Sequence, residues 1–208
     1  MGISERRKRE KEELKNRIFM AAAELLVKEG YENLSVRNIA KKIDYSPTTI
    51  YLYFSNKSEL VTSIIAKGYD IYLQRLNKCE ETYGEDPIEN LRRLLRVYID
   101  VGIENPNLYR AIFFTELVNQ FFLSEALKKG ASSQAGLSNL TSAIEAGVKK
   151  GALEKCDAEL VAQTLWSAVH GIVSLVVVQK DLSAQRQKAL IETLLDTLIN
   201  GLKKKRIK

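Results

Sequence analysis

Apolar residues in this chain recur at intervals of three and four positions, which is the spacing of a helix with one buried face. The clearest stripe is Val36, Ile39, Ala40 and Ile43, preceded by Ser35 as a helix cap. The chain lacks a convincing run of the period-two alternation typical of strands, so the predicted fold class is all-α. Stripes, caps and breaks together predict about nine helices, at 7–29, 36–43, 47–53, 57–83, 87–104, 106–122, 124–150, 157–180 and 184–204.

A tight turn follows the helix at 36–43. Asp44 and Tyr45 interrupt the apolar pattern there. Ser46-Pro47 restarts it, because serine is a strong N-cap and proline has a backbone angle suited to the first helical position. Two short helices joined by such a turn, with a third helix close behind, have the layout of a helix-turn-helix that reads DNA.

The second short helix buries Ile50 and Phe54 and turns its other residues outward. Hydroxyl and aromatic groups are in excess on this outward face, which indicates that it meets something other than water. A capping box of Asn56 and Glu59 opens the next helix. Lys57 lies in its first turn, where the helix dipole disfavours a cation. One interpretation is a DNA phosphate nearby, and the alternative is a tolerated surface lysine.

Several motifs stand close together in roughly the first sixty residues: Ile18-Phe19-x-Ala21-Ala22-x-x-Leu25-Leu26, Gly30-Tyr31, Ser35-Val36-x-x-Ile39-Ala40, Ser46-Pro47-x-Thr49-Ile50-Tyr51-x-Tyr53-Phe54 and Lys57-x-x-Leu60. Together they resemble the N-terminal domain of the tetracycline-repressor (TetR) family. The resemblance implies an all-helical homodimer, in which three N-terminal helices bind double-stranded DNA and the remainder binds a small molecule and forms the dimer interface. Asp44 departs from the glycine usual in the family's turn, but aspartate tolerates a left-handed backbone.

On this resemblance, residues 1–60 form the DNA-binding domain and residues 61–208 the ligand-binding and dimerisation domain. The predicted function is a repressor that binds a near-palindromic operator as a homodimer and is released by an unidentified small-molecule inducer. The alternative is a sequence-tolerant architectural DNA-binding protein without an inducer. The predicted DNA-binding residues are Ser35, Arg37, Ser46, Pro47, Thr48, Thr49, Tyr51, Tyr53 and Lys57. The two threonines are expected at base edges and the other hydroxyls at phosphates.

Aromatic residues in the second half supply the candidate ligand site. The phrase Trp166-Ser167-Ala168-Val169-His170-Gly171 resembles the Trp/His-Gly signature of one C-terminal branch of the same family. The candidate ligand-binding residues are Tyr98, Tyr109, Phe113, Phe114, Trp166 and His170. Ordinary core packing is the alternative for these aromatic side chains, and a satisfied core histidine is the alternative for His170.

The last two predicted helices are heavily apolar. This pattern predicts self-association, with two helices from each subunit in a four-helix interface. The candidate dimerisation residues are Val169, Val173, Ile191, Leu194, Leu195 and Leu198. A core within one chain is the alternative.

The 208 residues are 45% hydrophobic, enough for a sizeable core, and the net charge of +6 is concentrated at the termini. Residues 1–60 carry a net charge of +3, residues 61–202 of −2 and the tail KKKRIK of +5. The basic residues of the N-terminal arm are diluted by glutamates. This arm is expected either to follow DNA phosphates or to form a solvated helix with charge pairs four residues apart. The tail is expected to be solubilising first and a DNA contact second.

Several classes of function find little support in the composition. One histidine and two cysteines without CxxC spacing predict no metal site and no cofactor, and they leave no catalytic constellation for an enzyme. No run of about twenty apolar residues predicts a membrane span. The charged N-terminus has no apolar segment behind it, so no secretory signal is expected and the predicted location is the cytoplasm.

Overall fold

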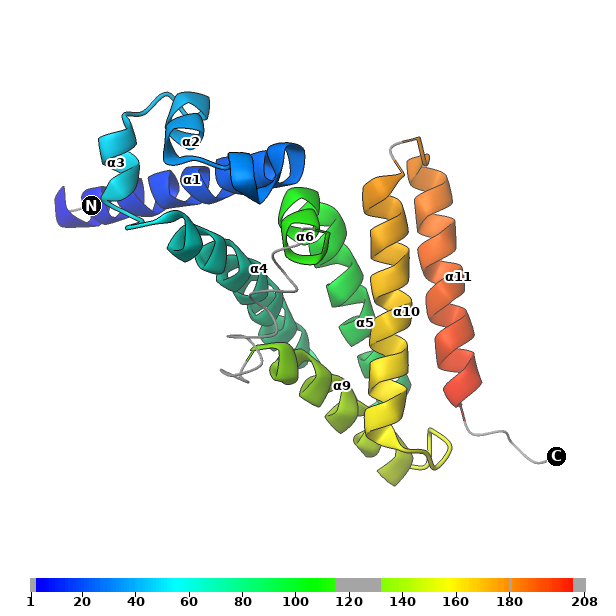
Figure 1. Ribbon diagram of the computed structural model, residues 1–208. Coiled ribbons are helices and arrows are strands. Elements are labelled where there is room, and N and C mark those ends of the chain that lie inside the picture. The colour runs from blue at the N-terminus through cyan, green and yellow to red at the C-terminus, as the bar shows by residue number, and fades with distance from the viewer. Residues whose placement is uncertain (1–2, 115–131, 180, 204–208) are drawn as a thin grey trace. The chain divides into compact units, whose positions relative to one another are not determined.

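The computed structural model describes residues 3–114, 132–179 and 181–203. Nine helices occupy them: α1 (Ile3–Asn33), α2 (Val36–Lys42), α3 (Pro47–Tyr51), α4 (Lys57–Glu80), α5 (Pro87–Glu104), α6 (Pro106–Phe113), α9 (Ser132–Lys149), α10 (Ala158–Val178) and α11 (Ala184–Leu202) (Figure 1). These residues form no strand, only an isolated antiparallel bridge between Leu153 and Lys203. The all-α prediction is confirmed.

Most predicted helix boundaries lie within a few residues of the observed ones. The first helix starts at Ile3 rather than at residue 7, and its helical path breaks at Gly30, whose φ of 78° and ψ of 171° favour glycine. α6 ends at Phe113, earlier than the predicted 106–122, because Phe114 leaves the helical region with φ −120° and ψ 8°. The remainder of that prediction, and the predicted helix start at residue 124, lie outside the described residues.

The described residues form two compact units. The first runs from the N-terminus to Gly68 and also includes residues 105–114, which contain α6. The second contains residues 69–104 and those from Ser132 onwards. The prediction had divided the chain once, after residue 60. The structure adds α6 to the N-terminal unit because this helix packs on α1. How DNA binding, ligand binding and dimerisation divide along the chain stays a prediction.

The core of the first unit is built by α1 together with the short helices. Ile18, Ala22 and Leu26 of α1 are buried, as are Ile39 of α2 and Ile50 of α3. The rings of Phe19 and Phe54 meet edge to face with centroids 5.4 Å apart. Thus the apolar stripes read from the sequence are the surfaces on which the helices pack.

α4 and α6 approach each other closely at Gly68. A Cβ atom added to Gly68 would lie 2.3 Å from Cδ1 of Ile112, far inside van der Waals contact. Leu108, Tyr109 and Ile112 are the buried side of α6. The absence of a side chain at Gly68 therefore allows this buried face to sit against α4.

The second unit packs α5, α9, α10 and α11 around a mainly aliphatic core (Figure 1). Its α5–α11 contact also carries ion pairs. Arg92 donates to Glu192 and to Asp196 at 2.5 Å each, and Arg96 donates to Glu192 at 2.6 Å. One carboxylate thus bridges two arginines across the contact, which adds a partly buried network to the apolar packing.

The candidate dimerisation residues divide by burial. Val169, Val173, Ile191 and Leu195 are each at most 4% exposed within their own chain, so they belong to the core of the second unit. The alternative left open by the sequence, an intrachain core, accounts for their apolar character. Leu194 and Leu198 are half-buried and keep surface available to a partner.

Among the described helices, α10 is long and apolar enough to cross a membrane by length and composition. No membrane span was predicted from the sequence. Core helices of water-soluble proteins meet the same criterion, and α10 has one side packed against α5, α9 and α11. A membrane role does not follow from its composition.

Candidate nucleic-acid interface and ligand site

The turn between α2 and α3 is held by backbone geometry at Asp44. Asp44 has a φ of 58°, in the left-handed region, and the amide of Tyr45 donates to the carbonyl of Ala40 at 2.9 Å. This six-to-one hydrogen bond is that of a Schellman helix end, in which the left-handed residue is most often glycine. The expectation that aspartate would sustain the turn is confirmed. At the other end of α2, Ser35 accepts from the amide of Asn38 at 3.1 Å, as predicted.

Ser46 caps α3 and also binds one of the candidate base-reading threonines. Its Oγ accepts from the Thr49 amide at 3.2 Å and lies 2.9 Å from the Thr49 hydroxyl. Thr49 is half-buried, whereas Pro47 and Thr48 are exposed. Thr48 is therefore the threonine with its polar group open to a ligand, while Thr49 is engaged within the cap.

At the C-terminal end of α3 and just past it, the exposed surface becomes apolar. Tyr51 is 57% exposed and Leu52 is 78% exposed, while Ile50 and Phe54 are buried as predicted. Leu52 and the exposed Tyr45 were missed by the sequence interpretation. The available signal was that neither large side chain falls on the apolar stripe formed by Ile50 and Phe54.

The start of α4 differs from the prediction in two contacts. The Glu59 amide donates to Asn56 Oδ1 at 2.8 Å as expected, but the Glu59 carboxylate accepts from Ser55 rather than from the Asn56 amide, at 2.7 Å. Lys57 donates to the carbonyl of Glu32 at 3.2 Å, and its Nζ lies 3.9 Å from the centroid of the Tyr31 ring. These contacts within the chain explain a lysine at this helix start without a phosphate. Its DNA contact stays a prediction.

Arg37 and the N-terminal arm are exposed. In the arm, Arg6 pairs with Glu10 at 2.8 Å and Arg9 with Glu13 at 3.3 Å, all within α1. The charge pairs expected of a solvated helix are therefore present, and a contact of the arm with DNA phosphates stays a prediction. Exposed pairs of this kind contribute little to stability.

The candidate ligand residues fall into two separate clusters. In the second unit, Tyr98 OH lies 2.9 Å from His170 Nδ1, and the Trp166 and His170 rings stack with centroids 5.2 Å apart. Tyr72, absent from the prediction, meets Tyr98 edge to face at 5.6 Å. We call Tyr72, Tyr98, Trp166 and His170 the aromatic cluster. Its tyrosine from α4 was beyond sequence reasoning, because nothing local to residue 72 indicates a contact with α5.

The other three candidates, Tyr109, Phe113 and Phe114, lie together in the first unit. Tyr109 is buried with its ring 4.9 Å from that of Phe113 and 6.0 Å from that of Phe114. Ordinary packing accounts for Tyr109, which lies on the buried side of α6, whereas Phe114 is 51% exposed.

Burial favours the uncharged forms of His170 and Tyr72 in the aromatic cluster. Burial lowers the pKa of His170 below its ordinary 6.5 and raises the pKa of Tyr72 above its ordinary 10.0. Such a cluster offers aromatic surface with a few hydrogen-bonding tips, which suits an apolar molecule carrying a small polar group.

Metal chemistry finds no support among the described residues, since no three His, Cys, Asp or Glu side chains are grouped to hold an ion. Cys79 is half-buried, and burial is the main cause that raises the pKa of its thiol.

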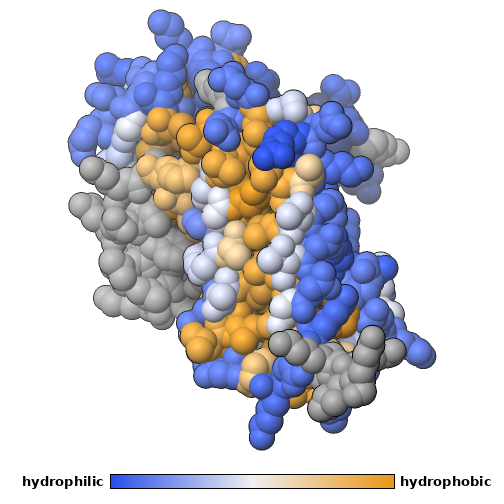
Figure 2. Space-filling model, turned by 90° about the vertical axis from the view of Figure 1, so that its right-hand side faces the viewer, coloured by the Kyte–Doolittle hydropathy of each residue, from blue (hydrophilic) through white to orange (hydrophobic). Residues whose placement is uncertain are grey.

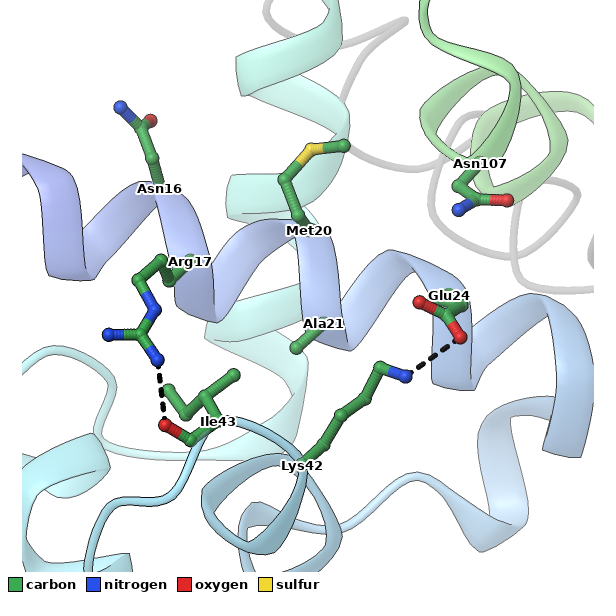
Figure 3. A pocket seen from close by; sticks show the side chains of 8 residues that line it. All are labelled: Asn16, Arg17, Met20, Ala21, Glu24, Lys42, Ile43 and Asn107. Atoms are coloured by element: carbon green, nitrogen blue, oxygen red, sulfur yellow. Dashed lines mark hydrogen bonds and ion pairs between the residues drawn. The ribbon is translucent and has the colours of Figure 1, made fainter.

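A hollow of about 470 Å³ lies in the first unit, open to solvent, where α1, the end of α2 and α6 meet (Figure 3). Two interactions span it. Arg17 donates to the carbonyl of Ile43 at 2.9 Å, and Lys42 pairs with Glu24 at 2.7 Å. Both join α1 to the end of α2. The residues that line the hollow are Asn16, Arg17, Met20, Ala21, Glu24, Lys42, Ile43 and Asn107.

Comparison with known families identifies both parts of the chain. Residues 18–64 match the bacterial regulatory proteins of the tetR family, and residues 91–198 match a tetracyclin repressor-like C-terminal domain. The second match covers more than half of the chain.

Individual relatives agree with these family matches. An HTH-type transcriptional regulator of Staphylococcus aureus (strain USA300) is 25% identical over 129 residues, which is 55% of this chain and 69% of the relative. The ketosteroid transcriptional regulator KstR2 of Mycobacterium tuberculosis has a TM-score of 0.75 at 15% identity, covering 91% of this chain and 95% of its own. The regulator FadR from Bacillus subtilis, solved with stearoyl-CoA, has a TM-score of 0.69 at 22% identity, covering 90% and 99% respectively. At these identities the structures show the shared fold.

The left-handed turn predicts an unusual order of stability among variants of Asp44. Asp44→Gly should be more stable than Asp44→Ala by about 1 kcal/mol, because alanine pays the steric cost of a positive φ and glycine does not. Urea denaturation measures the difference. At the exposed helical Asp70 the order should reverse, with alanine above glycine. The same order at both positions would contradict the role assigned to the turn.

The buried imidazole predicts that stability falls as pH drops through 6.5. Below that ordinary pKa, His170 of the unfolded chain takes up a proton, whereas His170 of the folded protein stays neutral. The free energy of unfolding therefore decreases until the pH falls below the lowered pKa of the folded protein. Urea denaturation between about pH 7.5 and about pH 5.5 should show a shallower loss for His170→Phe than for wild type. His170 is the chain's single histidine, so no other imidazole contributes. An equal loss in both proteins would contradict the prediction.

Proposed function

The chain belongs to the tetR family of bacterial transcriptional regulators, and we propose that it represses transcription by binding a near-palindromic operator as a homodimer that a small molecule releases. It is a helix-turn-helix regulator and not an enzyme. The observation that carries the proposal is the exposed face of α3, held between the left-handed turn at Asp44 and the capped start of α4. We place its action in the cytoplasm, where the DNA is.

The chemistry of α3 supports DNA as the partner of this face. Thr48 offers a methyl and a hydroxyl group to base edges, Tyr51 offers a phenol to phosphate, and Leu52 offers apolar surface to thymine methyl groups. Three of the other predicted contacts, Ser35, Arg37 and Lys57, flank this face in the sequence. They carry hydroxyl or cationic groups of the kind that bind a phosphate backbone.

The shortness of α3 supports a dimer. Its five residues can read only a few base pairs, so a specific site requires two copies about one turn of DNA, roughly 34 Å, apart.

In the second unit, a band of hydrophobic surface runs over α10 and α11 (Figure 2). On α10 it includes Leu160, Leu175 and Val178, exposed by 60%, 44% and 60%.

The exposed apolar positions of α10 form one helical stripe. Leu160, Thr164, Gly171, Leu175 and Val178 follow one another at helical spacings and are all exposed, opposite the side buried in the chain's own core. Leu194 and Leu198 of α11 add half-buried surface. We therefore assign the dimer interface to this stripe with Leu194 and Leu198, in place of Val169, Val173, Ile191 and Leu195.

The aromatic cluster is the proposed site of the inducer. A ligand releases DNA only if it binds more tightly to a conformation whose recognition helices are wrongly placed. α4 starts beside α3 in the sequence and carries Tyr72 in the second unit, so one helix connects the two functions. The names of the relatives, a ketosteroid regulator and a FadR bound to stearoyl-CoA, suggest apolar probes. Trp166, the chain's single tryptophan, supplies a fluorescence readout of binding.

An architectural DNA-binding protein is the second candidate function, and the basic termini are the observation that favours it. It would bind most duplexes alike, with steep salt dependence and little dependence on α3. The glutamate partners of Arg6 and Arg9 reduce the charge that the arm has for this purpose.

The repressor proposal predicts that full-length protein selects one inverted repeat from a random duplex pool. It should bind that repeat about a thousandfold more tightly than a scrambled duplex, the usual margin of specific over non-specific binding. Thr48→Ala should reduce this preference, because it removes a side chain from the exposed face of α3. Thr62→Ala, at an exposed position of α4, is the control and should leave it unchanged. Equal affinity for both duplexes would establish the architectural alternative.

The proposed dimer interface predicts that a charge placed on the exposed stripe of α10 prevents dimerisation. Leu175→Asp should weaken dimerisation about a hundredfold, because a carboxylate would be buried in an apolar interface without a partner. Sedimentation velocity should show dimer for wild type and monomer for the variant at the same concentration, with loss of binding to the inverted repeat. Ala146→Asp, at an exposed position of α9, adds the same charge outside the stripe and should remain dimeric. A dimeric Leu175→Asp protein would refute the assignment.

A further inference from the structure

Arg17 of α1 contacts both neighbours of Asp44, the residue that makes the helix-turn-helix turn. Its Nη2 donates to the carbonyl of Ile43 at 2.9 Å, and its guanidinium carbon lies 5.3 Å from the centroid of the Tyr45 ring. Ile43 precedes the left-handed Asp44, and Tyr45 follows it. Figure 3 shows the hydrogen bond at the edge of the hollow between α1 and α2. We call these two contacts the Arg17 bridge.

We propose that Arg17 is a positioning residue for the recognition helix, acting through Ile43 and Tyr45 rather than by touching DNA. This inference rests on the proposed DNA-binding function. Tyr45 is the single residue between the left-handed Asp44 and Ser46, the cap of α3. Its backbone therefore sets the direction in which α3 leaves the turn, and a small rotation there displaces Thr48 and Tyr51 relative to a bound duplex.

Both contacts draw on properties particular to arginine. The carbonyl of Ile43 lies at the C-terminal end of α2, where the helix dipole is negative and a cation is favourable. A planar guanidinium can donate in its plane to that carbonyl while its face or edge meets an aromatic ring. Lysine has one compact charge and cannot reproduce both contacts from one position. Tyr45 remains 39% exposed, so the arginine supplies a contact that a core would otherwise provide.

The neighbouring ion pair provides a built-in comparison. Lys42 and Glu24 also join the end of α2 to α1, at 2.7 Å across the same hollow, but they do not contact the turn. If holding α2 against α1 were sufficient, the two connections would be equivalent for DNA binding. If the turn itself has to be held, loss of Arg17 will matter more than loss of Glu24.

The test uses the full-length protein and the duplex that wild type selects from a random pool. Arg17→Met should weaken binding about tenfold, the effect of one charge-assisted hydrogen bond. Tyr45→Leu should weaken it similarly, and Tyr45→Phe should retain wild-type affinity because the ring remains. Arg17→Met combined with Tyr45→Leu should be little worse than either alone, since both changes break one bridge. Glu24→Gln is the control and should bind close to wild type.

The salt dependence separates positioning from a direct phosphate contact. For a positioning residue, the slope of log affinity against log salt stays at its wild-type value in Arg17→Met. A fall in the slope by about 0.9 would mean that Arg17 neutralises a phosphate, and it would overturn the inference. Independent, additive losses from Arg17→Met and Tyr45→Leu would overturn it as well, as would unchanged affinity in Arg17→Met.

Amide hydrogen exchange without DNA tests the bridge independently of the proposed function. Exchange at residues 44–46 should be faster in Arg17→Met than in wild type and unchanged in Glu24→Gln, because only the arginine contacts the turn. If wild type selects no duplex, the proposed function fails, and with it the DNA-positioning role of Arg17. Faster exchange in that case would still identify the bridge as a support of the turn. Unchanged exchange in Arg17→Met would refute the bridge itself.

Discussion

The reversal of the backbone at Asp44 is the constraint on which the DNA-facing part of the protein depends. A single left-handed residue ends α2, permits the hydrogen bond from Tyr45 to Ala40 and directs the chain into the cap of α3. The side chains of α3 can bind DNA only in a fixed orientation. For that orientation, the backbone geometry at Asp44 matters more than the few contacts that α3 makes. Aspartate at this position has a conformational cost that glycine would avoid, and the surrounding packing of α1 and α2 sustains it.

Features encoded by neighbouring residues could be predicted from the sequence, and features made by distant residues could not. The apolar stripe through Ile39, the cap at Ser46 and the positive φ at Asp44 each depend on residues within one or two helical turns. By contrast, the placement of α6 on α1 depends on side chains about ninety positions apart. No periodicity in either helix indicates which surface it will meet.

The same distinction explains the corrections to the predicted sites. The apolar sequence of α10 indicates that the helix is buried. It does not indicate which side packs against its own chain and which side would meet a partner. Val169 and Val173 proved to face inward, while the exposed stripe carries Leu160, Leu175 and Val178, which the sequence analysis did not select. Likewise, the candidate aromatic residues divided between two units, because aromatic content alone does not distinguish packing from a site. Tyr72 entered the cluster from α4, and Arg17 reached Tyr45 from 28 positions away.

The close approach at Gly68 places a limit on how this sequence can diverge. A methyl group at position 68 would occupy the space of the Ile112 side chain. A mutation of Gly68 to alanine would therefore require this side chain to rotate, or position 112 to carry a smaller residue. Whether a substitution at one of these positions is tolerated therefore depends on the residue at the other. The two positions are expected to change together among descendants of this protein. Homologues with a larger residue at the position of Gly68 should carry a smaller one on α6, or hold α6 farther from α4.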